Sequence, residues 1–268
     1  MDRPGTKPSP TAITIRNARK AFFRNSGESL NVLDGIDLDV ASGEFLAILG
    51  PSGCGKSTLL NVLARVEVLD SGRVEYNLDA ENSAKGKIAV AWQEESLMPW
   101  KTVHKNIEFP LIATNSANTE RKDRVEKWIA AVGLNGFADY YPSQLSQGMR
   151  KRVSLAAALV SEPDLLLMDE PFSSLDPYTK RQIEKEVVRL WESLDTTIIL
   201  VTHDVQEAVA LADRIVVLTA RPARVESVRD NPLPRPRDLD ALYGQTEFHE
   251  IVRELWLHLT EGHNEATP

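Results

Sequence analysis

One short glycine-rich segment constrains this chain more than any other feature. Residues 50–57 read Gly-Pro-Ser-Gly-Cys-Gly-Lys-Ser, which fits the P-loop pattern G-x-x-x-x-G-K-[ST]. The glycines of such a loop let several backbone N–H groups point at one anion, and the following helix adds a favourable dipole. An apolar run, residues 45–49, comes directly before the loop, and a helix-like stretch, residues 57–65, follows it. This order predicts a nucleotide-binding α/β fold.

The side chains of the loop indicate which parts of a nucleotide they contact. Lys56 can reach the β- and γ-phosphates, and the Ser57 hydroxyl can bind Mg²⁺. Cys54 is the single cysteine, which excludes an internal disulfide and a cysteine-rich zinc site, so we expect a small loop residue rather than a functional thiol. The other predicted nucleotide contacts of this segment are Gly50, Pro51, Ser52, Gly53, Gly55 and Thr58.

A second motif is an apolar strand, residues 165–168, that ends in two acids, Asp169 and Glu170. Carboxylates at the C-terminal end of a parallel strand face the crevice where ligands bind. Asp169 is predicted to contact Mg²⁺, directly or from its outer coordination sphere. Glu170 is predicted to be the base that polarises the attacking water. Alone the pair would fit an exposed acidic turn equally well, but the upstream P-loop favours the catalytic interpretation.

The remaining periodicity predicts two kinds of sheet. Residues 11–16 and 36–40 alternate apolar with polar side chains, as half-buried antiparallel strands do. Continuous apolar runs at residues 197–201 and 214–218 are typical of strands buried on both faces. Helices between such runs imply a largely parallel sheet.

Helix signals fall between the strands. Asp176 before Pro177 predicts one helix start, and Asp204 with Glu207 three residues later predicts another, with the spacing of a capping box. Signals between residues 94 and 160 are mainly helical and predict a helical insertion into the α/β core.

The C-terminal part, residues 231–268, follows a main domain predicted to span residues 11–230. Residues 231–236 are proline-rich and predict a linker, after which an amphipathic helix is expected. Packing on the main body is the simpler interpretation of its apolar stripe, and binding to a partner is the alternative. The stripe consists of Phe248, Ile251, Val252, Leu255, Trp256 and Leu259.

Charge and hydropathy limit the partners of the chain. Its 268 residues have a formal net charge of -8 and a pI of about 5.3, so we expect no nucleic-acid partner. Mean hydropathy is -0.26, and no apolar run approaches the roughly 18 residues of a spanning helix. Residues 1–10 are polar and proline-rich and predict a disordered leader without a secretory signal. Membrane association is therefore expected through a partner protein.

Six elements occur in an order that resembles the ATP-binding subunit of ABC transporters. They are the P-loop, Gln93, the signature Ser146-Gln147-Gly148, the Asp169-Glu170 strand, Ser174-Leu175-Asp176 and His203. The resemblance covers residues 11–228. It implies a P-loop NTPase fold, in which a RecA-like α/β core has an N-terminal antiparallel β subdomain and an inserted helical subdomain.

This resemblance implies further site residues. Phe22 matches an aromatic side chain that stacks on adenine, although Phe23 is the alternative and either can be a core aromatic. Gln93 matches a glutamine that touches Mg²⁺ and the attacking water, and His203 matches a histidine that contacts the γ-phosphate. Asp176 matches a loop at a dimer interface and is also a plain N-cap.

The resemblance also implies that ATP and Mg²⁺ lie between two copies of the chain. Ser146, Gln147 and Gly148 of one copy are expected to contact the ATP bound by the other. Gln147 stands where the family usually has glycine, and Ala157 where arginine is common. Either departure can lower the ATPase rate or alter the dimer interface.

A membrane permease and a solute class are implied as well. Pro99-Trp100 followed by Thr102-Val103 resembles the branch that imports nitrate, sulfonates, taurine and similar anions, although importers of pyrimidine precursors share much of the pattern. Trp100 is interpreted either as an anchor for the permease or as a core residue. A periplasmic or lipoprotein solute-binding protein would act indirectly, and the chain would lie peripherally on the cytoplasmic side of the inner membrane.

Two other classes of protein remain as alternatives. A soluble ABC ATPase of translation or DNA repair usually carries tandem cassettes or a long coiled coil, neither of which this sequence contains. A nucleotide-binding regulator without turnover is suggested only by Gln147, and Glu170 and His203 argue against it.

Overall fold

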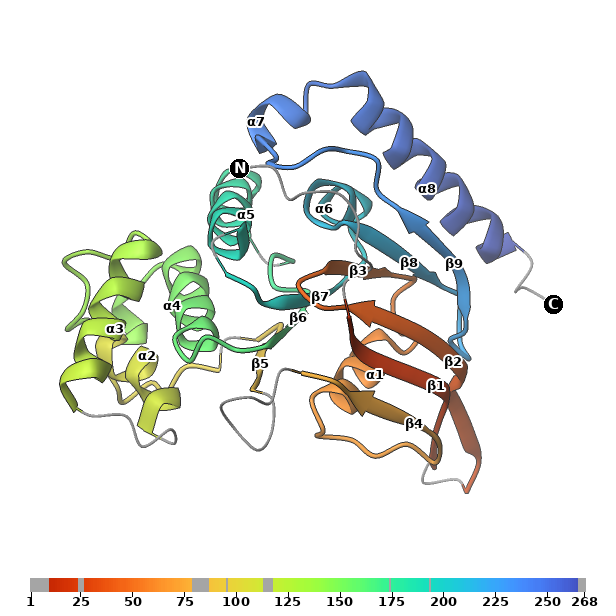
Figure 1. Ribbon diagram of the computed structural model, residues 1–268, viewed down its shortest axis with the longest axis horizontal. Coiled ribbons are helices and arrows are strands. Elements are labelled where there is room, and N and C mark those ends of the chain that lie inside the picture. The colour runs from red at the N-terminus through yellow and green to blue at the C-terminus, as the bar shows by residue number, and fades with distance from the viewer. Residues whose placement is uncertain are drawn as a thin grey trace.

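The computed structural model describes residues 10–23, 27–78, 87–94, 96–112, 118–173, 175–192 and 194–264. The structure contains two sheets and a separate group of helices at one side (Figure 1). Residues 1–9 of the predicted leader, which spans residues 1–10, and Ser174 of the predicted dimer loop lie outside the described residues.

The central sheet has six strands in the order β5-β6-β7-β3-β8-β9, and neighbouring strands are parallel except for the antiparallel pair β8 and β9. The strands β3, β6 and β7 are buried along their whole length, as their continuous apolar runs predict. In chain order the strands are β3 (Phe45–Leu49), β5 (Ile88–Ala91), β6 (Leu165–Asp169), β7 (Thr197–Thr202), β8 (Arg214–Leu218) and β9 (Val225–Asp230).

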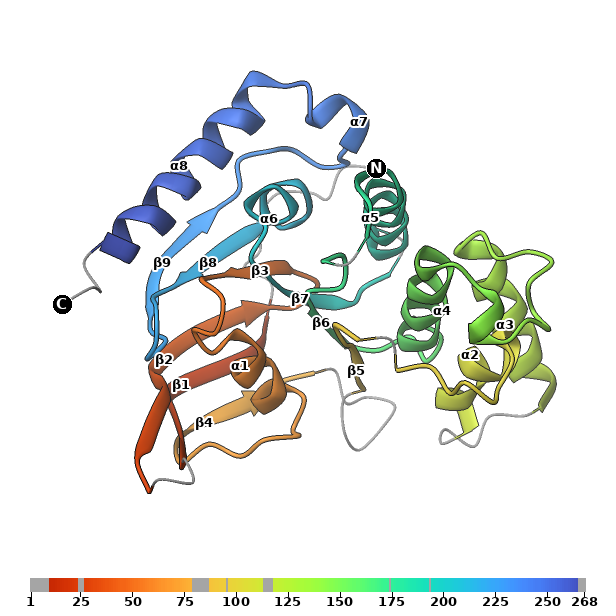
Figure 2. The same ribbon diagram turned by 180° about the vertical axis from the view of Figure 1, so that it is seen from behind.

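Alternate residues of β3 enter two different cores. Leu46 and Ile48 pack with helix α1 (Lys56–Leu63) and with the smaller sheet, whereas Phe45 and Ala47 pack with helices α5 (Pro177–Glu192) and α6 (Val205–Leu211). Helix α1 therefore lies between the two sheets, on the face of the central sheet opposite α5 and α6 (Figure 2).

The smaller sheet is antiparallel and has the order β2-β1-β4. Its strands are β1 (Thr11–Phe23), β2 (Ser29–Ala41) and β4 (Ser71–Tyr76), so the first two are longer than the alternation at residues 11–16 and 36–40 predicts. Asn17 explains the difference for β1, because its φ of 47° belongs to a bulge that shifts the register of β1 and interrupts the alternation.

Three helices beside the edge strand β5 lie within the span predicted to be a helical insertion (Figure 1). They are α2 (Val103–Ile112), α3 (Asn118–Ala131) and α4 (Gln147–Leu159). Helix α4 begins at Gln147. Ser146 is its N-cap, and the Ser146 hydroxyl accepts a hydrogen bond from the Met149 N–H at 3.3 Å.

The C-terminal segment, residues 231–264, contains helices α7 (Leu239–Leu242) and α8 (Thr246–Asn264). The buried stripe residues Phe248, Val252 and Leu255 confirm packing on the main body, although Trp256 is 51% exposed. None of the helices, taken over the residues described above, is both long and apolar enough to cross a bilayer.

Residues 231–236 do connect β9 to α7, but they are fixed to the core rather than serving as a free linker. The Asn231 amide donates to the carbonyls of Val209 and Ala212, both at 2.8 Å, and the buried Arg237 guanidinium also donates to Ala212. These carbonyls lie at the C-terminal end of α6, where a helix leaves its last acceptors without intrahelical partners. Burial lowers the pKa of Arg237 to about 10.

Candidate functional site

A cavity of about 420 Å³ opens between the P-loop and the antiparallel sheet. Most of the residues that the sequence predicts to contact a nucleotide line it, together with Leu30, Val32 and Arg221. The predicted residues found in its wall are Phe22, Ser52, Gly53, Gly55, Lys56, Ser57, Thr58, Gln93 and Glu170. The cavity therefore brings together residues from five distant parts of the chain.

The P-loop is held in a tight curve by Lys56. Its ammonium is buried and donates hydrogen bonds to the carbonyls of Gly50 at 2.8 Å and Pro51 at 2.9 Å. Gly55 has a φ of 129°, and a Cβ there would lie 2.9 Å from the Val32 side chain, so only glycine fits. This curve places the charge of Lys56 at the centre of an anion cradle.

Cys54 is buried in the P-loop, and burial raises the pKa of its thiol. Its Sγ would lie 3.0 Å from a Cβ built on Gly50. A buried thiol with a raised pKa is unreactive, so Cys54 fits the predicted role of a small loop residue.

Ser57 and Asp169 meet below the cavity. The Ser57 hydroxyl donates to Asp169 Oδ1 at 3.1 Å, although these residues come from α1 and from the end of β6. Burial raises the pKa of the Asp169 carboxyl, and the neighbouring Glu170 raises it further. A hydroxyl and a buried carboxylate beside a phosphate cradle fit Mg²⁺, which takes one or two protein oxygens and fills its shell with phosphate and water. No larger cluster of His, Cys, Asp and Glu that could hold a metal occurs within the described ranges.

Glu170 and His203 face each other at the C-terminal ends of β6 and β7. Glu170 Oε2 lies 2.9 Å from His203 Nδ1, and the Glu170 side chain is 17% exposed. The Glu170 backbone has a φ of 42°, a left-handed conformation that is uncommon for a glutamate, and its N–H donates to the Val201 carbonyl at 2.9 Å. Such strained backbone positions cluster at active sites.

Phe22 and Gln93 form opposite parts of the cavity wall. Phe22 lines the cavity from the antiparallel sheet, whereas Phe23 is 82% exposed and does not line it. Gln93 follows β5, and its carbonyl accepts a hydrogen bond from the Lys151 ammonium of α4. Gln93 thus connects the cavity with the helical region.

The signature residues Ser146, Gln147 and Gly148 do not line this cavity. They lie at the start of α4, where a Cβ on Gly148 would be 2.4 Å from the Thr179 Cγ2 of α5. A side chain at position 148 would therefore disturb the close packing of α4 on α5. Within one chain the structure does not bring the signature to the P-loop.

Arg221 is a cavity residue to which the sequence assigned no role. Its Nε donates to the Gly53 carbonyl at 2.9 Å, and a second nitrogen of the same guanidinium donates there too. Next to it, the Ala223 N–H donates to the Val32 carbonyl at 2.8 Å, and Arg224 pairs with Asp34 of β2. This segment, residues 221–224, ties the P-loop to the antiparallel sheet.

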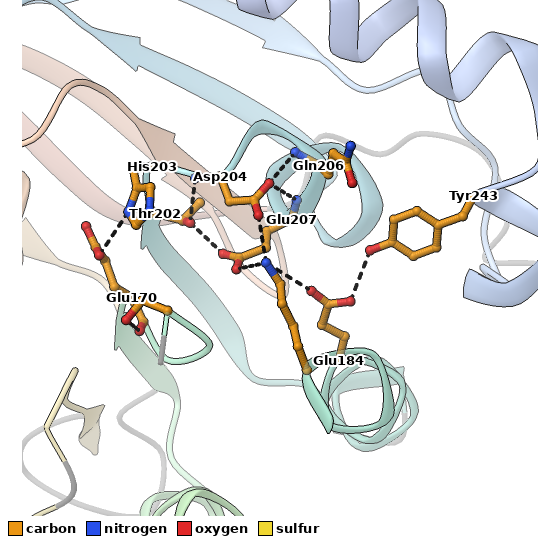
Figure 3. Close-up of polar contacts among 10 residues, drawn as sticks. Glu170, Glu184, Thr202, His203, Asp204, Gln206, Glu207 and Tyr243 are labelled. Atoms are coloured by element: carbon orange, nitrogen blue, oxygen red, sulfur yellow. Dashed lines mark hydrogen bonds and ion pairs between the residues drawn. The ribbon is translucent and has the colours of Figure 1, made fainter. Parts of the chain in front are cut away.

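Behind His203 lies a cluster of buried and half-buried polar side chains from α5, from the start of α6 and from the end of α7 (Figure 3). The Lys180 ammonium lies 2.7 Å from Asp204 Oδ2, 2.5 Å from Glu207 Oε1 and 4.0 Å from Glu184 Oε1. Tyr243, the C-cap of α7, donates its hydroxyl to Glu184 Oε2 at 3.0 Å. We call these five residues the Lys180 cluster.

The Lys180 cluster corrects one prediction from the sequence. Asp204 caps α6 as expected, because its carboxylate accepts from the N–H groups of Gln206 and Glu207. Glu207, however, does not complete a capping box. Its carboxylate pairs with Lys180 and accepts from the Thr202 hydroxyl at 2.5 Å, and that same hydroxyl accepts the Asp204 N–H.

The cluster predicts a pH-dependent stability. Burial raises the pKa of Glu184 to about 7 from 4.5; Lys180 opposes the shift and Glu207 adds to it. Because the folded state holds this proton more tightly, the stabilising contribution of protonated Glu184 should be lost as pH rises from 4.5 to 7. A Glu184→Gln variant lacks this titration, so its stability relative to wild type should rise with pH, by roughly 3 kcal/mol in total.

Urea unfolding of both proteins at several pH values from 4.5 to 8 measures this difference. Glu192→Gln, an exposed change on the same helix, controls for the loss of one negative charge from α5. A stability difference between Glu184→Gln and wild type that stays constant over this pH range would contradict the prediction.

A second cavity, of about 410 Å³, lies between β5 and the helical region. Its wall includes Met98, Phe109 and Pro110 on one side and Ala157 and Ala158 of α4 on the other. Trp100 follows the segment that lines this groove and is 73% exposed. The interpretation of Trp100 as a core residue is therefore wrong.

Comparison with known proteins gives consistent likenesses over most of the chain. Residues 33–173 match the protein family described as ABC transporter. An uncharacterized ABC transporter ATP-binding protein of Methanocaldococcus jannaschii is 42% identical over 243 residues, which cover 91% of this chain and 89% of that protein. The aliphatic sulfonates import ATP-binding protein SsuB of Bacillus cereus is 37% identical over 243 residues, or 91% of this chain and 94% of the relative.

A solved structure extends the likeness to three dimensions. The dimeric ATP-binding cassette MJ0796, in a post-hydrolysis state bound to ADP and Pi, matches with a TM-score of 0.72 at 30% identity. The match covers 83% of this chain and 100% of that chain. These likenesses confirm the predicted P-loop NTPase fold.

Proposed function

This chain belongs to the ABC transporter family as an ATP-binding cassette, and we propose that it powers the import of a small anionic solute through a separate membrane permease. Cassettes of this family bind ATP and hydrolyse it to drive transport. The observation that carries the proposal is the cavity that has both the P-loop lysine, Lys56, and Glu170 in its wall, with His203 in contact with Glu170.

In the proposed reaction, the backbone N–H groups of the P-loop and the Lys56 ammonium bind the phosphates of ATP. Phe22 stacks on the adenine ring from the antiparallel sheet. Ser57 and Asp169 would hold Mg²⁺, which would neutralise charge that develops on the phosphates. Gln93 contacts this centre from the end of β5.

Glu170 accepts a proton from the attacking water, and His203 orients that carboxylate through the 2.9 Å contact between Nδ1 and Oε2. In addition, His203 contacts the γ-phosphate from the end of β7. Both residues therefore act at the side of the cavity where the bond to the γ-phosphate breaks.

A second copy of the chain is part of the proposed site. Ser146, Gln147 and Gly148 do not line the cavity of their own chain, and they lie at the N-terminus of a helix of 13 residues, which favours anions. The related cassette MJ0796 is dimeric in its solved structures. We propose that two chains assemble head to tail, with each signature on the other chain's ATP.

The groove between β5 and the helical region is the proposed binding site for the permease. Its wall is largely apolar, it opens to solvent, and exposed Trp100 stands beside it, as aromatic anchors of interfaces do. Binding there would hold the chain peripherally at the cytoplasmic face of the inner membrane. A periplasmic or lipoprotein solute-binding protein would deliver the solute to the permease.

Aliphatic sulfonates are the leading solute class, because SsuB relatives are similar over most of the chain and because residues 99–103 fit the same branch. Nitrate and taurine are the alternatives. The test is uptake by vesicles that contain the chain together with the permease that co-purifies with it. ATP-dependent uptake of a labelled aliphatic sulfonate, above that of nitrate or taurine, supports the proposal. Failure to co-purify with any integral membrane protein would instead favour a soluble ABC ATPase.

Replacing Trp100 with alanine separates docking from folding. Because the side chain is 73% exposed, we expect the isolated variant to keep its ATPase rate and to lose at most about 0.5 kcal/mol of stability. If Trp100 anchors the permease, the affinity of the variant for the permease should fall by about thirtyfold, as for a typical interface hot spot. Pull-down by the tagged permease and thermal unfolding measure the two effects.

Trp256→Ala is the matched control, since it removes a half-exposed tryptophan from α8, on the opposite side of the molecule from the helical region (Figure 1). Trp100→Ala that still binds the permease with wild-type affinity would exclude the anchoring role.

A further inference from the structure

We propose that Lys180 is a positioning residue for ATP hydrolysis: its ammonium fixes the turn that carries His203, and Tyr243 extends this control to the C-terminal segment. The proposal rests on the proposed role of His203 in hydrolysis. It concerns a group of charged residues that neither line the cavity nor take part in the proposed chemistry of the P-loop.

The turn at His203 is held from both sides by side chains that meet at Lys180. On one side, the Thr202 hydroxyl donates to Glu207, and Glu207 pairs with Lys180 at 2.5 Å. On the other side, Asp204 pairs with Lys180 at 2.7 Å. Residues 202 and 204 are therefore anchored to one ammonium, and the His203 ring projects from between them to Glu170 (Figure 3).

The charge balance of the cluster depends on Lys180. Three carboxylates, from Glu184, Asp204 and Glu207, surround one ammonium, and Glu184 and Glu207 are almost completely buried. Without the ammonium, Asp204 and Glu207 would be two neighbouring negative charges in a site of low dielectric, where like charges repel strongly. The repulsion would separate Asp204 from Glu207 and shift the turn between them.

Tyr243 forms the outer end of the cluster. Its hydroxyl donates to one oxygen of Glu184, whose other oxygen lies 4.0 Å from the Lys180 ammonium. The ring of Tyr243 is fixed by an edge contact with Phe248 of α8, with ring centroids 5.1 Å apart, and by the Arg181 guanidinium, 4.1 Å from its centroid. The C-terminal segment thus reaches the turn of His203 through two side chains.

Steady-state kinetics of Lys180→Met test the proposal in the full chain. We expect kcat for ATP hydrolysis to fall by about tenfold or more, with KM for ATP within about twofold of wild type, since no residue of the cluster lines the cavity. Lys180→Arg, which keeps the charge, should recover most of kcat. Lys185→Met is the matched control, because Lys185 lies on the same helix and pairs with Asp240 at 2.5 Å, away from residues 202–207.

A double-mutant cycle with His203→Ala identifies the route of the effect. If Lys180 acts through His203, Lys180→Met should lower kcat little further in the His203→Ala background. Additive losses would overturn the proposal while leaving the role of His203 intact. Full hydrolysis by His203→Ala would overturn both.

One further result would overturn the whole proposal, and another would overturn its part on Tyr243. In the first result, Lys180→Met lowers the melting temperature, kcat and KM change together, and Lys180→Arg recovers neither. That combination would indicate that Lys180 is a purely structural residue. The other concerns Tyr243→Phe, which removes only the hydroxyl. We expect it to lower kcat by about twofold to fivefold, and an unchanged kcat would remove the C-terminal segment from the proposal.

Discussion

Replacing Glu170 with glutamine is expected to slow ATP hydrolysis by roughly a hundredfold or more while ATP binding persists. Glutamine keeps the shape of the side chain but cannot accept a proton from water. Lys56, Ser57 and the N–H groups of the P-loop are unchanged, so the affinity for ATP should stay near that of wild type. Single-turnover hydrolysis and titration with a fluorescent ATP analogue measure the two quantities separately.

The chain supplies a close control for this variant. Glu162 also has a left-handed backbone, with a φ of 49° against 42° for Glu170, but it does not line the cavity. Glu162→Gln therefore reproduces the same chemical change in the same backbone conformation and should hydrolyse ATP at the wild-type rate. Near-normal hydrolysis by Glu170→Gln would show that another group is the base.

Mixing two inactive variants is expected to restore ATPase activity if the signature acts across a dimer. Lys56→Ala disables the P-loop of one chain, and Ser146→Asp disables the signature of the other by placing a carboxylate beside the phosphates. In each mixed dimer both defects fall in one site and the other site is intact. Random mixing of equal amounts should recover about a quarter of the wild-type activity per chain if the two sites work independently.

Aspartate at position 146 is chosen because it should leave the fold unchanged. Aspartate is as good an N-cap as serine, so it can accept the Met149 N–H in place of the hydroxyl. A side chain on Gly148 would be a poorer choice, since its Cβ would collide with Thr179. Two affinity tags show that mixed dimers form. Mixed dimers without activity would mean that the signature does not act in trans or that both sites must be intact together.

Local motifs explain why much of the site is predictable from the sequence. The P-loop and the Asp169-Glu170 strand end are each a continuous stretch of sequence, because one loop and one strand must present several groups to the same phosphates. The continuous apolar runs identify β3, β6 and β7, since a strand buried on both faces has no polar alternation.

Contacts between distant segments leave no such pattern. Arg221 meets Gly53 although the two are 168 residues apart, and Lys180 meets residues of α6 that follow a complete strand. Residues 231–236 look like a linker because their proline content is visible in the sequence. The α6 carbonyls that bind Asn231 and Arg237 cannot be recognised in the sequence.

Bulges and side-chain exposure are equally hidden from periodicity. Asn17 interrupts the alternation of β1 by entering the left-handed region, so the strand reads as shorter than it is. Trp100 and Trp128 are the same residue type in the same helical region, yet Trp100 is 73% exposed and Trp128 only 4%. Only the packing of the helices around them distinguishes the two.

The segment 221–224 has a thermodynamic consequence for nucleotide binding. It joins the P-loop, through Arg221 and Gly53, to the strand β2, which pairs with the strand that carries Phe22. The two ends of the cavity, which are proposed to bind phosphates and adenine, are thus connected by hydrogen bonds of the chain itself. A preorganised site loses little conformational entropy on binding. The free energy of nucleotide contacts then remains available for the association of two chains.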